Sequence, residues 1–182
     1  MKKFALLILA LLAMPLIAGL YGALHDQVSF TISPEYFTRF KYDQFGFDPR
    51  WFGGDRPTVA LIGFLATWWV GALIGLFLGF TALLQPNAEA MKRALIRAAV
   101  ITFGIAILCA IIGLVNGWWF MQDIPYGWVI PDDVEDRAAF RSVGSMHNFS
   151  YGGGVAGLII ALIDMEWRRN KSKLSLRRKG SA

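Results

Sequence analysis

Apolar residues follow one another along this chain in four long runs, and they show neither strict alternation nor a heptad repeat. The runs cover residues 4–24, 58–84, 98–120 and 146–166, and charged side chains are absent until the end of the last run. A helix needs about 20 apolar residues to cross the hydrocarbon core of a bilayer. The pattern therefore predicts an all-α membrane protein, a four-transmembrane-helix bundle over residues 1–167, with a basic cytoplasmic tail at residues 168–182.

The first run also resembles a secretory signal peptide, because Lys2 and Lys3 precede it. Its apolar stretch of about 20 residues, however, is longer than the roughly 7–15 residues of a signal sequence. Tyr21-Gly22-Ala23 also places a bulky tyrosine where the cleavage site needs a small residue. We therefore favour an uncleaved membrane helix, and the count of four helices depends on it.

Composition and charge agree with a membrane protein and predict its orientation. The chain is 55% hydrophobic and 17% charged, whereas a soluble domain carries about a quarter charged residues. Twelve of the eighteen Lys and Arg residues lie at the N-terminus, in the connection at residues 85–97 and in the tail, with three acids. The other two connections, residues 25–57 and 121–145, hold ten acids and six basic residues. The positive-inside rule then places both termini in the cytoplasm, and the chain in a bacterial inner membrane.

The expected partners follow from the same distribution of charge and from small residues inside the helices. The basic tail directly follows a membrane helix, so its nearest partner is the lipid bilayer and not a nucleic acid. Small residues at four-residue spacing allow close packing of helices in lipid, either within the chain or in a homo-oligomer or a complex with another membrane protein. These packing residues are Gly63, Thr67, Gly71, Gly75 and Gly79 in the second helix, and Gly153 and Gly157 in the fourth.

The two acidic connections have patterns of their own, which predict a small periplasmic cap. Residues 28–33 alternate apolar and polar side chains, as a half-buried strand does, and residues 126–130 are the candidate partner strand. Ser33-Pro34-Glu35 predicts the start of a helix that ends near Gln44, with aromatic side chains resting on lipid. Residues 132–135 predict a second short amphipathic helix. The cap would thus consist of a strand pair and short helices.

Three stretches resemble a group of uncharacterised bacterial four-helix integral membrane proteins. They are residues 25–41 (HDQVSFTISPEYFTRFK), 64–71 (FLATWWVG) and 146–153 (MHNFSYGG). The resemblance extends over nearly the whole chain. It implies the four-helix architecture and carries no activity with it.

The candidate chemistry lies at the outer side, where both histidines of the chain fall. His25 and His147, with Asp26 or Glu35, would supply three or four ligands of the kind zinc accepts, and two histidines alone could ligate haem. The alternative is that both histidines bond to loop backbone and hold the cap to the bundle. The single cysteine, Cys109, cannot form an internal disulfide.

The sequence favours a non-enzymatic structural or partner-binding membrane subunit without a cofactor. A metal- or haem-binding redox module that uses His25 and His147 is the alternative. A small transporter is the second alternative, but the last three helices offer few polar groups, among them Asn116, and no acid or base for a proton relay. Ser150 lies three residues after His147, but no motif of a catalytic nucleophile surrounds it.

Overall fold

The computed structural model describes residues 1–121 and 130–179, and nearly all of them are helical. Four helices are long and apolar enough to cross a membrane. They are α1 (Lys2–Ile32), α4 (Asp55–Ala82), α5 (Ala88–Trp119) and α6 (Arg137–Lys179). Between α1 and α4 lie α2 (Pro34–Tyr36), the π-helical turn η1 (Phe37–Lys41), α3 (Tyr42–Phe45) and the 3-10 turn η2 (Pro49–Phe52). The prediction of an all-α chain with four membrane-compatible helices is confirmed.

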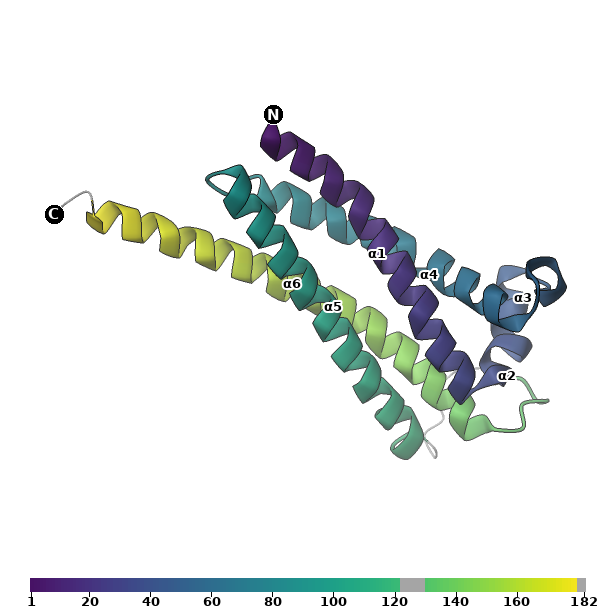
Figure 1. Cartoon of the computed structure of the whole chain (residues 1–182). Helices are drawn as coiled ribbons and strands as arrows, with labels where there is room; N and C mark the ends of the chain where they lie inside the picture. The colour runs from purple at the N-terminus through teal and green to yellow at the C-terminus, as the bar shows by residue number, and fades with distance from the viewer. Residues whose placement is uncertain (122–129, 180–182) are drawn as a thin grey trace.

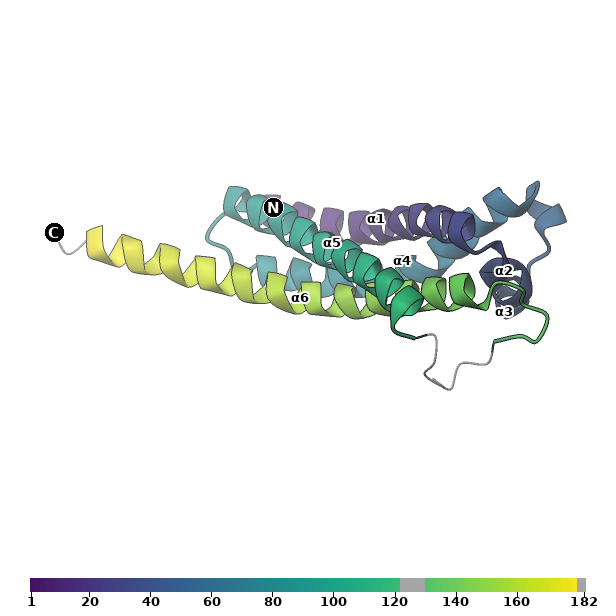
Figure 2. The same ribbon diagram turned by 90° about the horizontal axis from the view of Figure 1, so that it is seen from below.

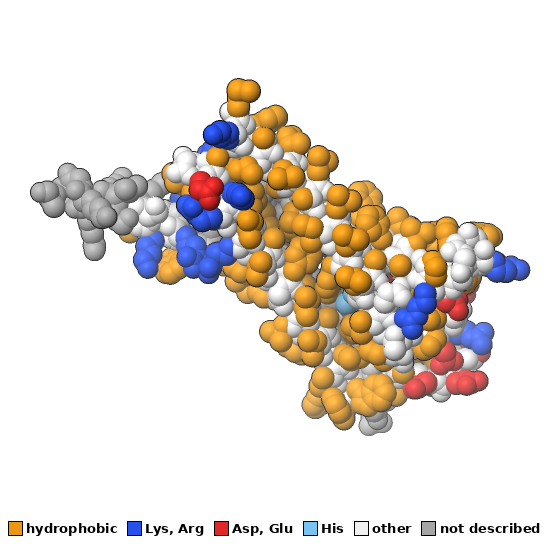
Figure 3. Space-filling view, in the orientation of Figure 1, with side chains coloured by type: hydrophobic (Ala, Val, Ile, Leu, Met, Phe, Trp, Pro, Cys, Tyr) orange, Lys and Arg blue, Asp and Glu red, His pale blue; other side chains and the backbone are white. Residues whose placement is uncertain are grey.

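The four long helices form two closely packed pairs, α1 with α4 and α5 with α6. The two pairs pack against each other to form one elongated bundle (Figures 1 and 2). The N-terminus, the α4–α5 connection and the end of α6 lie at one end of the bundle, and α2 and α3 lie at the other (Figures 1 and 2). The side of the bundle seen in Figure 3 is covered with apolar side chains, and Lys and Arg gather at the end that holds the N-terminus. This distribution suits a bundle whose flank faces lipid.

The α1·α4 pair is closest where Gly22 meets Gly63. A Cβ atom added to Gly63 would lie 2.2 Å from the carbonyl oxygen of Gly22, so no side chain fits between the two backbones. One turn further along α4, Thr67 Oγ1 donates a hydrogen bond of 2.7 Å to the carbonyl oxygen of Ala18. The rest of the small-residue stripe of α4, which is Gly71, Gly75 and Gly79, also lies against α1. Within this chain the stripe is therefore covered, and it is not a free surface for a second copy.

The α5·α6 pair is also packed closely through small residues. Gly153 of α6 lies against Ala106 and Cys109 of α5, and Gly157 lies against the backbone of Thr102. Cys109 thus packs as a small apolar side chain in a helix contact. The two pairs are joined mainly by larger apolar side chains near the middle and the basic end, including Met14, Leu78, Met91 and Met165.

The predicted strand pair is wrong for the part that the structure describes, since residues 28–32 belong to α1 and no strand occurs in residues 1–121 or 130–179. The hydroxyl side chains in this last part of α1 are bonded within the helix and need no partner strand. Ser29 Oγ donates to the carbonyl oxygen of His25 and Thr31 Oγ1 to that of Gln27. The candidate partner strand at residues 126–130 lies outside the described residues, except for Ile130, which has no regular structure.

The first short helix of the predicted cap is present as α2, η1 and α3, but Tyr36 and Phe37 point into the protein. The second is wrong as a separate element, because residues 132–136 are not helical and the helix that follows them is the long α6. Tyr36 is 6% exposed and Phe37 is fully buried, so these two rings do not rest on lipid. They pack against Val59 and Ile62 of α4 and against Phe140 of α6, in a second core at this end of the bundle. This core fixes the segment between α1 and α4 over the ends of the long helices.

The last long helix exceeds its predicted limits in both directions. α6 begins at Arg137, where the Asp136 carboxylate accepts a hydrogen bond of 2.9 Å from the amide of Ala139 and so caps the first turn. It ends at Lys179, so the basic tail expected from Arg168 onward continues the membrane helix. Figure 1 shows this part of α6 extending beyond the other helices.

Glu35 connects the two outer segments. Its carboxylate accepts hydrogen bonds of 2.9 Å from the backbone amides of Glu135 and Asp136, directly before α6. These two amides hold the pKa of the Glu35 carboxyl below its usual value. The link between the segments is therefore complete only while Glu35 is ionised.

We expect acid to release this link. Because the pKa of Glu35 is lowered in the folded protein, its contribution is present above the unfolded value and is lost as the pH falls through the folded value. Hydrogen exchange of the Glu135 and Asp136 amides, corrected for its intrinsic pH dependence, should show protection at neutral pH that disappears in acid. Glu35→Gln should weaken the protection at neutral pH and remove the pH dependence. Glu89→Gln, at the opposite end, is the control, and equal behaviour of the two variants would contradict the link.

Candidate metal centre

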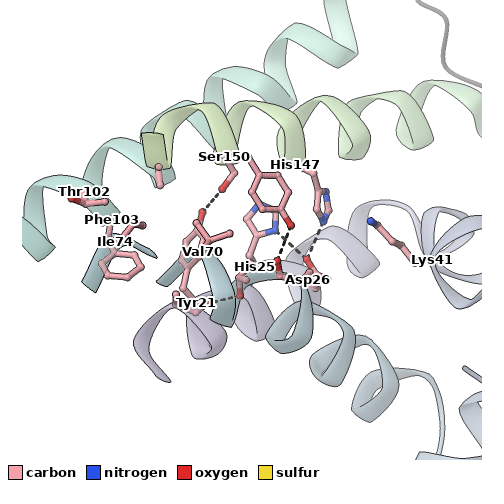
Figure 4. A pocket seen from close by; sticks show the side chains of 16 residues that line it. Tyr21, His25, Asp26, Lys41, Val70, Ile74, Thr102, Phe103, His147 and Ser150 are labelled. Carbon is pink, nitrogen blue, oxygen red and sulfur yellow. Dashed lines mark hydrogen bonds and ion pairs between the residues drawn. The ribbon is translucent and has the colours of Figure 1, made fainter. Parts of the chain in front are cut away.

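Two histidines and one aspartate from opposite helix pairs meet in the interior near the α2–α3 end of the bundle. His25 and Asp26 lie on α1 and His147 on α6 (Figure 4). One ligand atom from each of the three side chains can be chosen so that all three lie within 4.8 Å of one another. The side chains of His25 and Asp26 are 7% and 5% exposed, and that of His147 is 10% exposed. An acid buried between two imidazoles is an arrangement that proteins keep for function more often than for stability.

The hydrogen bonds of His147 determine which of its nitrogens faces the cluster as a ligand. Nδ1 lies 2.8 Å from the carbonyl oxygen of Val143, which can only accept, so Nδ1 carries the proton. In the neutral ring, Nε2 then has a lone pair, and it lies 3.0 Å from Asp26 Oδ1. A lone pair and a carboxylate oxygen at this distance need a cation between or beside them, either a proton or a metal ion.

His25 completes the cluster from the other side. Its ring meets that of His147 edge to face, with centroids 4.7 Å apart, and its Nδ1 lies 3.3 Å from Asp26 Oδ1. Its Nε2 is buried and has no hydrogen-bond partner among the residues that the structure describes. A buried ring nitrogen without a partner costs free energy, of the order of 1–3 kcal/mol, unless another group binds it.

Aromatic rings hold His147 in place. Tyr36 stacks on the His147 imidazole with centroids 5.0 Å apart, and Phe37 lies edge-on at 6.5 Å. Both rings come from the segment directly after α1, so the outer core closes the cluster at that end. Burial raises the pKa of the Tyr36 hydroxyl, so Tyr36 is a neutral wall of the site.

A cavity of about 50 Å³ adjoins the cluster and extends toward the centre of the bundle. Its lining is largely apolar, and Tyr21, Ser150 and Tyr151 contribute polar groups to it. Tyr21 and Ser150 share a hydrogen bond of 2.7 Å across the two helix pairs. The cavity has room for a few water molecules. It is partly open, and a histidine is visible in a hollow of the surface in Figure 3.

Lys41 reaches the same cavity from η1 (Figure 4). Its ammonium lies over the rings of Tyr36 and Phe40, at 5.7 and 5.1 Å from their centroids, and donates to Gln44 Oε1 at 2.8 Å. Burial lowers the pKa of Lys41, and the nearby Asp26 opposes this effect. Of the described residues that line the cavity, Lys41 is the one basic side chain besides the histidines, and Asp26 is the one acid.

The structure thus brings together three of the four residues that the sequence suggests as ligands. Glu35 is not among them, because its carboxylate binds the amides before α6. Ser150 is bonded to Tyr21 and not to His147, so the two do not form a nucleophile and base. Sequence reasoning missed Tyr21 and Lys41. Tyr21 could have been found from its position one turn before His25 on the same helix, but Lys41 had no comparable signal.

Comparisons with known proteins add no assignment to this geometry. No family model, no curated protein and no solved structure matches the chain. This result agrees with a resemblance that carries no activity. The chain is thus a protein with four membrane-compatible helices and a buried His-Asp-His cluster.

Proposed function

We propose that this integral membrane protein binds one divalent transition-metal ion, with zinc as the best fit, between His25, Asp26 and His147. The observation that carries the proposal is the hydrogen bonding of His147. Its Nδ1 is committed to the Val143 carbonyl, and its Nε2 faces the Asp26 carboxylate. Metal-binding histidines characteristically donate their second ring nitrogen to a carbonyl or carboxylate in this way, which fixes the tautomer and the ring.

A shared proton is the competing occupant. A proton between His147 and Asp26 would satisfy these two groups, whereas a metal ion would take an oxygen from Asp26 and a nitrogen from each histidine, and His25 Nδ1 lies 3.3 Å from Asp26 Oδ1. Zinc bonds of about 2.0–2.1 Å separate tetrahedral ligands by roughly 3.4 Å. The three ligand atoms already lie within 4.8 Å, so small side-chain rotations suffice.

The size of the cavity favours a single metal ion over haem. Three protein ligands and one open position suit four-coordinate zinc, and two histidines with one carboxylate are also the ligand set of non-haem iron(II), so metal analysis distinguishes the two ions. Haem would have to place its macrocycle between two imidazoles whose centroids are 4.7 Å apart. The cavity beside them measures about 50 Å³, and a cavity of about 150 Å³ is needed for benzene alone. The haem part of the alternative suggested by the sequence therefore has no support from the geometry.

Metal analysis of the purified protein tests the proposal. After exposure to zinc and extensive dialysis, we expect about one zinc ion per chain, and less than a tenth of that amount in His147→Gln. Glu35→Gln is the matched control and should retain the metal, since Glu35 lies outside the cluster. Wild-type protein that retains no metal would show that the His147–Asp26 pair shares a proton, and iron in place of zinc would change the identity of the ion.

The orientation and cellular location belong to the same proposal. We place both termini in the cytoplasm and the metal centre near the periplasmic face of a bacterial inner membrane. The support is the gathering of Lys and Arg at the end of the bundle opposite to α2 and α3 (Figure 3). Thiol labelling of intact cells carrying single cysteines at Gly46 or Asn87 distinguishes the two orientations. Reagents that do not cross the membrane should label the first position and not the second.

A structural or partner-binding role is the second candidate, and the surface at the α2–α3 end of the bundle favours it. Trp51 in η2 is 68% exposed, and residues 132–136, in the other segment at the α2–α3 end of the bundle, are rich in acids. Aromatic side chains are enriched where proteins meet partners, although tryptophan also marks the membrane interface. Isolation from native membranes under gentle conditions tests this role. A protein that comes out alone, in wild-type form and as Trp51→Ala, would argue against it.

No contact of the described residues specifically supports the transporter alternative. Asn116 donates to Ser145 Oγ at 3.2 Å between α5 and α6, and Thr102 Oγ1 donates to Ala98 within α5. The first bond joins two helices and the second lies within one helix, so both polar groups are already bonded inside the bundle.

A further inference from the structure

We propose that the open coordination position of the metal centre takes a small anion, which binds between the metal ion and Lys41. This inference rests on the metal site proposed above and names the class of ligand that the site accepts. The anion could be a free carboxylate or the acidic group at the end of a larger molecule, and in both cases the recognised chemistry is one compact anionic group.

The first reason to expect an anion is the charge around the cavity. A divalent ion brings two positive charges and Lys41 a third, against one negative charge on Asp26. No other acid is found among the described residues that line the cavity. Uncompensated charge in an apolar interior is costly. The loaded site therefore has a surplus of positive charge, and an anionic ligand removes part of it.

The second step is the position of Lys41. Its ammonium group is directed toward His147 and Asp26 in Figure 4, although Lys41 belongs to a different element from either of them. The rings of Tyr36 and Phe40 hold its side chain, and its ammonium donates a hydrogen bond to Gln44 Oε1. An ammonium has three protons to donate, so Lys41 can bind a ligand without giving up this contact.

The third step is the size and lining of the space. The cavity of about 50 Å³ holds a few water-sized groups. A formate-sized group therefore fits, and a bulky ring does not. The hydroxyl groups of Tyr21 and Ser150, which share a hydrogen bond, and that of Tyr151 add polar groups to the lining. The apolar remainder of the lining keeps competing water low, which strengthens the attraction between the anion and both cations.

The experiment uses the full-length protein in detergent with cobalt(II) in place of zinc, because four-coordinate cobalt has visible absorption bands that respond to a change of ligand. Formate and formamide are the probes, since they have nearly the same size and differ in charge. At constant ionic strength, formate should change the spectrum in a saturable way and formamide should not. Lys41→Met should bind cobalt in the same amount but weaken formate binding about tenfold or more, which is the usual strength of a charge-assisted hydrogen bond.

Two further variants make the result specific. Arg39→Met removes a charge from the same segment, but Arg39 is half exposed and paired with Asp133 at 3.1 Å, so formate binding should not change. Lys41→Arg keeps the charge and should bind formate within a few-fold of wild type, even if Lys41→Met folds poorly. Cobalt binding without any response to formate, or equal formate affinity in Lys41→Met, would overturn the inference and leave the metal centre intact. Absence of cobalt binding would overturn both.

Discussion

Asp26→Asn is expected to abolish the response of this protein to zinc. Asp26 supplies the negative charge of the cluster, and its Oδ1 lies 3.0 Å from His147 Nε2 and 3.3 Å from His25 Nδ1. An asparagine keeps the volume of the side chain but not its charge, so it is a poor ligand for a divalent ion. A ligand present at a hundred times its Kd stabilises the folded state by about 2.7 kcal/mol. For a chain of this size, this corresponds to a rise of Tm of roughly 5–10 °C.

Thermal denaturation in detergent with and without zinc measures the effect. Wild-type protein should show the rise of Tm, and Asp26→Asn should show none, whatever its Tm without metal. Asp48→Asn provides the comparison, because Asp48 is an acid in the exposed turn that caps η2 and bonds to Arg50. It should respond to zinc as wild type does. A zinc response in Asp26→Asn equal to that of wild type would mean that Asp26 is not a ligand.

Gly63→Leu is expected to separate α1 from α4 and to destabilise the fold by about 3 kcal/mol or more. The atom nearest to the new Cβ would be the backbone oxygen of Gly22, at 2.2 Å, and a backbone cannot rotate away as a side chain can. The helices must move apart, and the contact of Thr67 with Ala18 is then lost. Because Gly22 lies one turn before Asp26 on α1, we also expect weaker metal binding.

Gly104→Leu is the matched control for this change. Gly104 lies on α5, and a Cβ atom there would meet nothing within 4 Å, so leucine at this position would face lipid. Reversible unfolding in mixed detergent micelles gives the free energy of unfolding of both variants. Gly63→Leu should be much less stable than Gly104→Leu. Equal stabilities would show that α1 and α4 are not packed as closely as the structure has them.

The long helices could be predicted from the sequence because lipid demands about 20 apolar residues in a row, and few other structures contain such runs. The residues at which the helices begin and end could be predicted less well than the helices themselves. α1 continues to Ile32 because Ser29 and Thr31 bond to carbonyl oxygens of their own helix. The alternation at residues 28–33 cannot be distinguished from a helix by its period over so few positions.

The metal centre could be predicted only in part, for a physical reason. His25 and His147 are far apart in sequence, and the topology predicts that they lie on the same side of the membrane but not whether they meet. The burial of Tyr36 and Phe37 depends on contacts with α4 and α6. Lys41 reaches the cavity through the π-helical turn that follows Tyr36, and its place could not be inferred from the local pattern.

The most direct test of the metal centre is X-ray absorption at the zinc edge of the loaded protein. Wild-type protein should show two imidazole ligands and one or two oxygen ligands, with bonds of about 2.0–2.1 Å. The variant His25→Gln, loaded at a higher zinc concentration, should show one imidazole. A spectrum without imidazole ligands, or one that His25→Gln leaves unchanged, would contradict a zinc ion held by His25, Asp26 and His147.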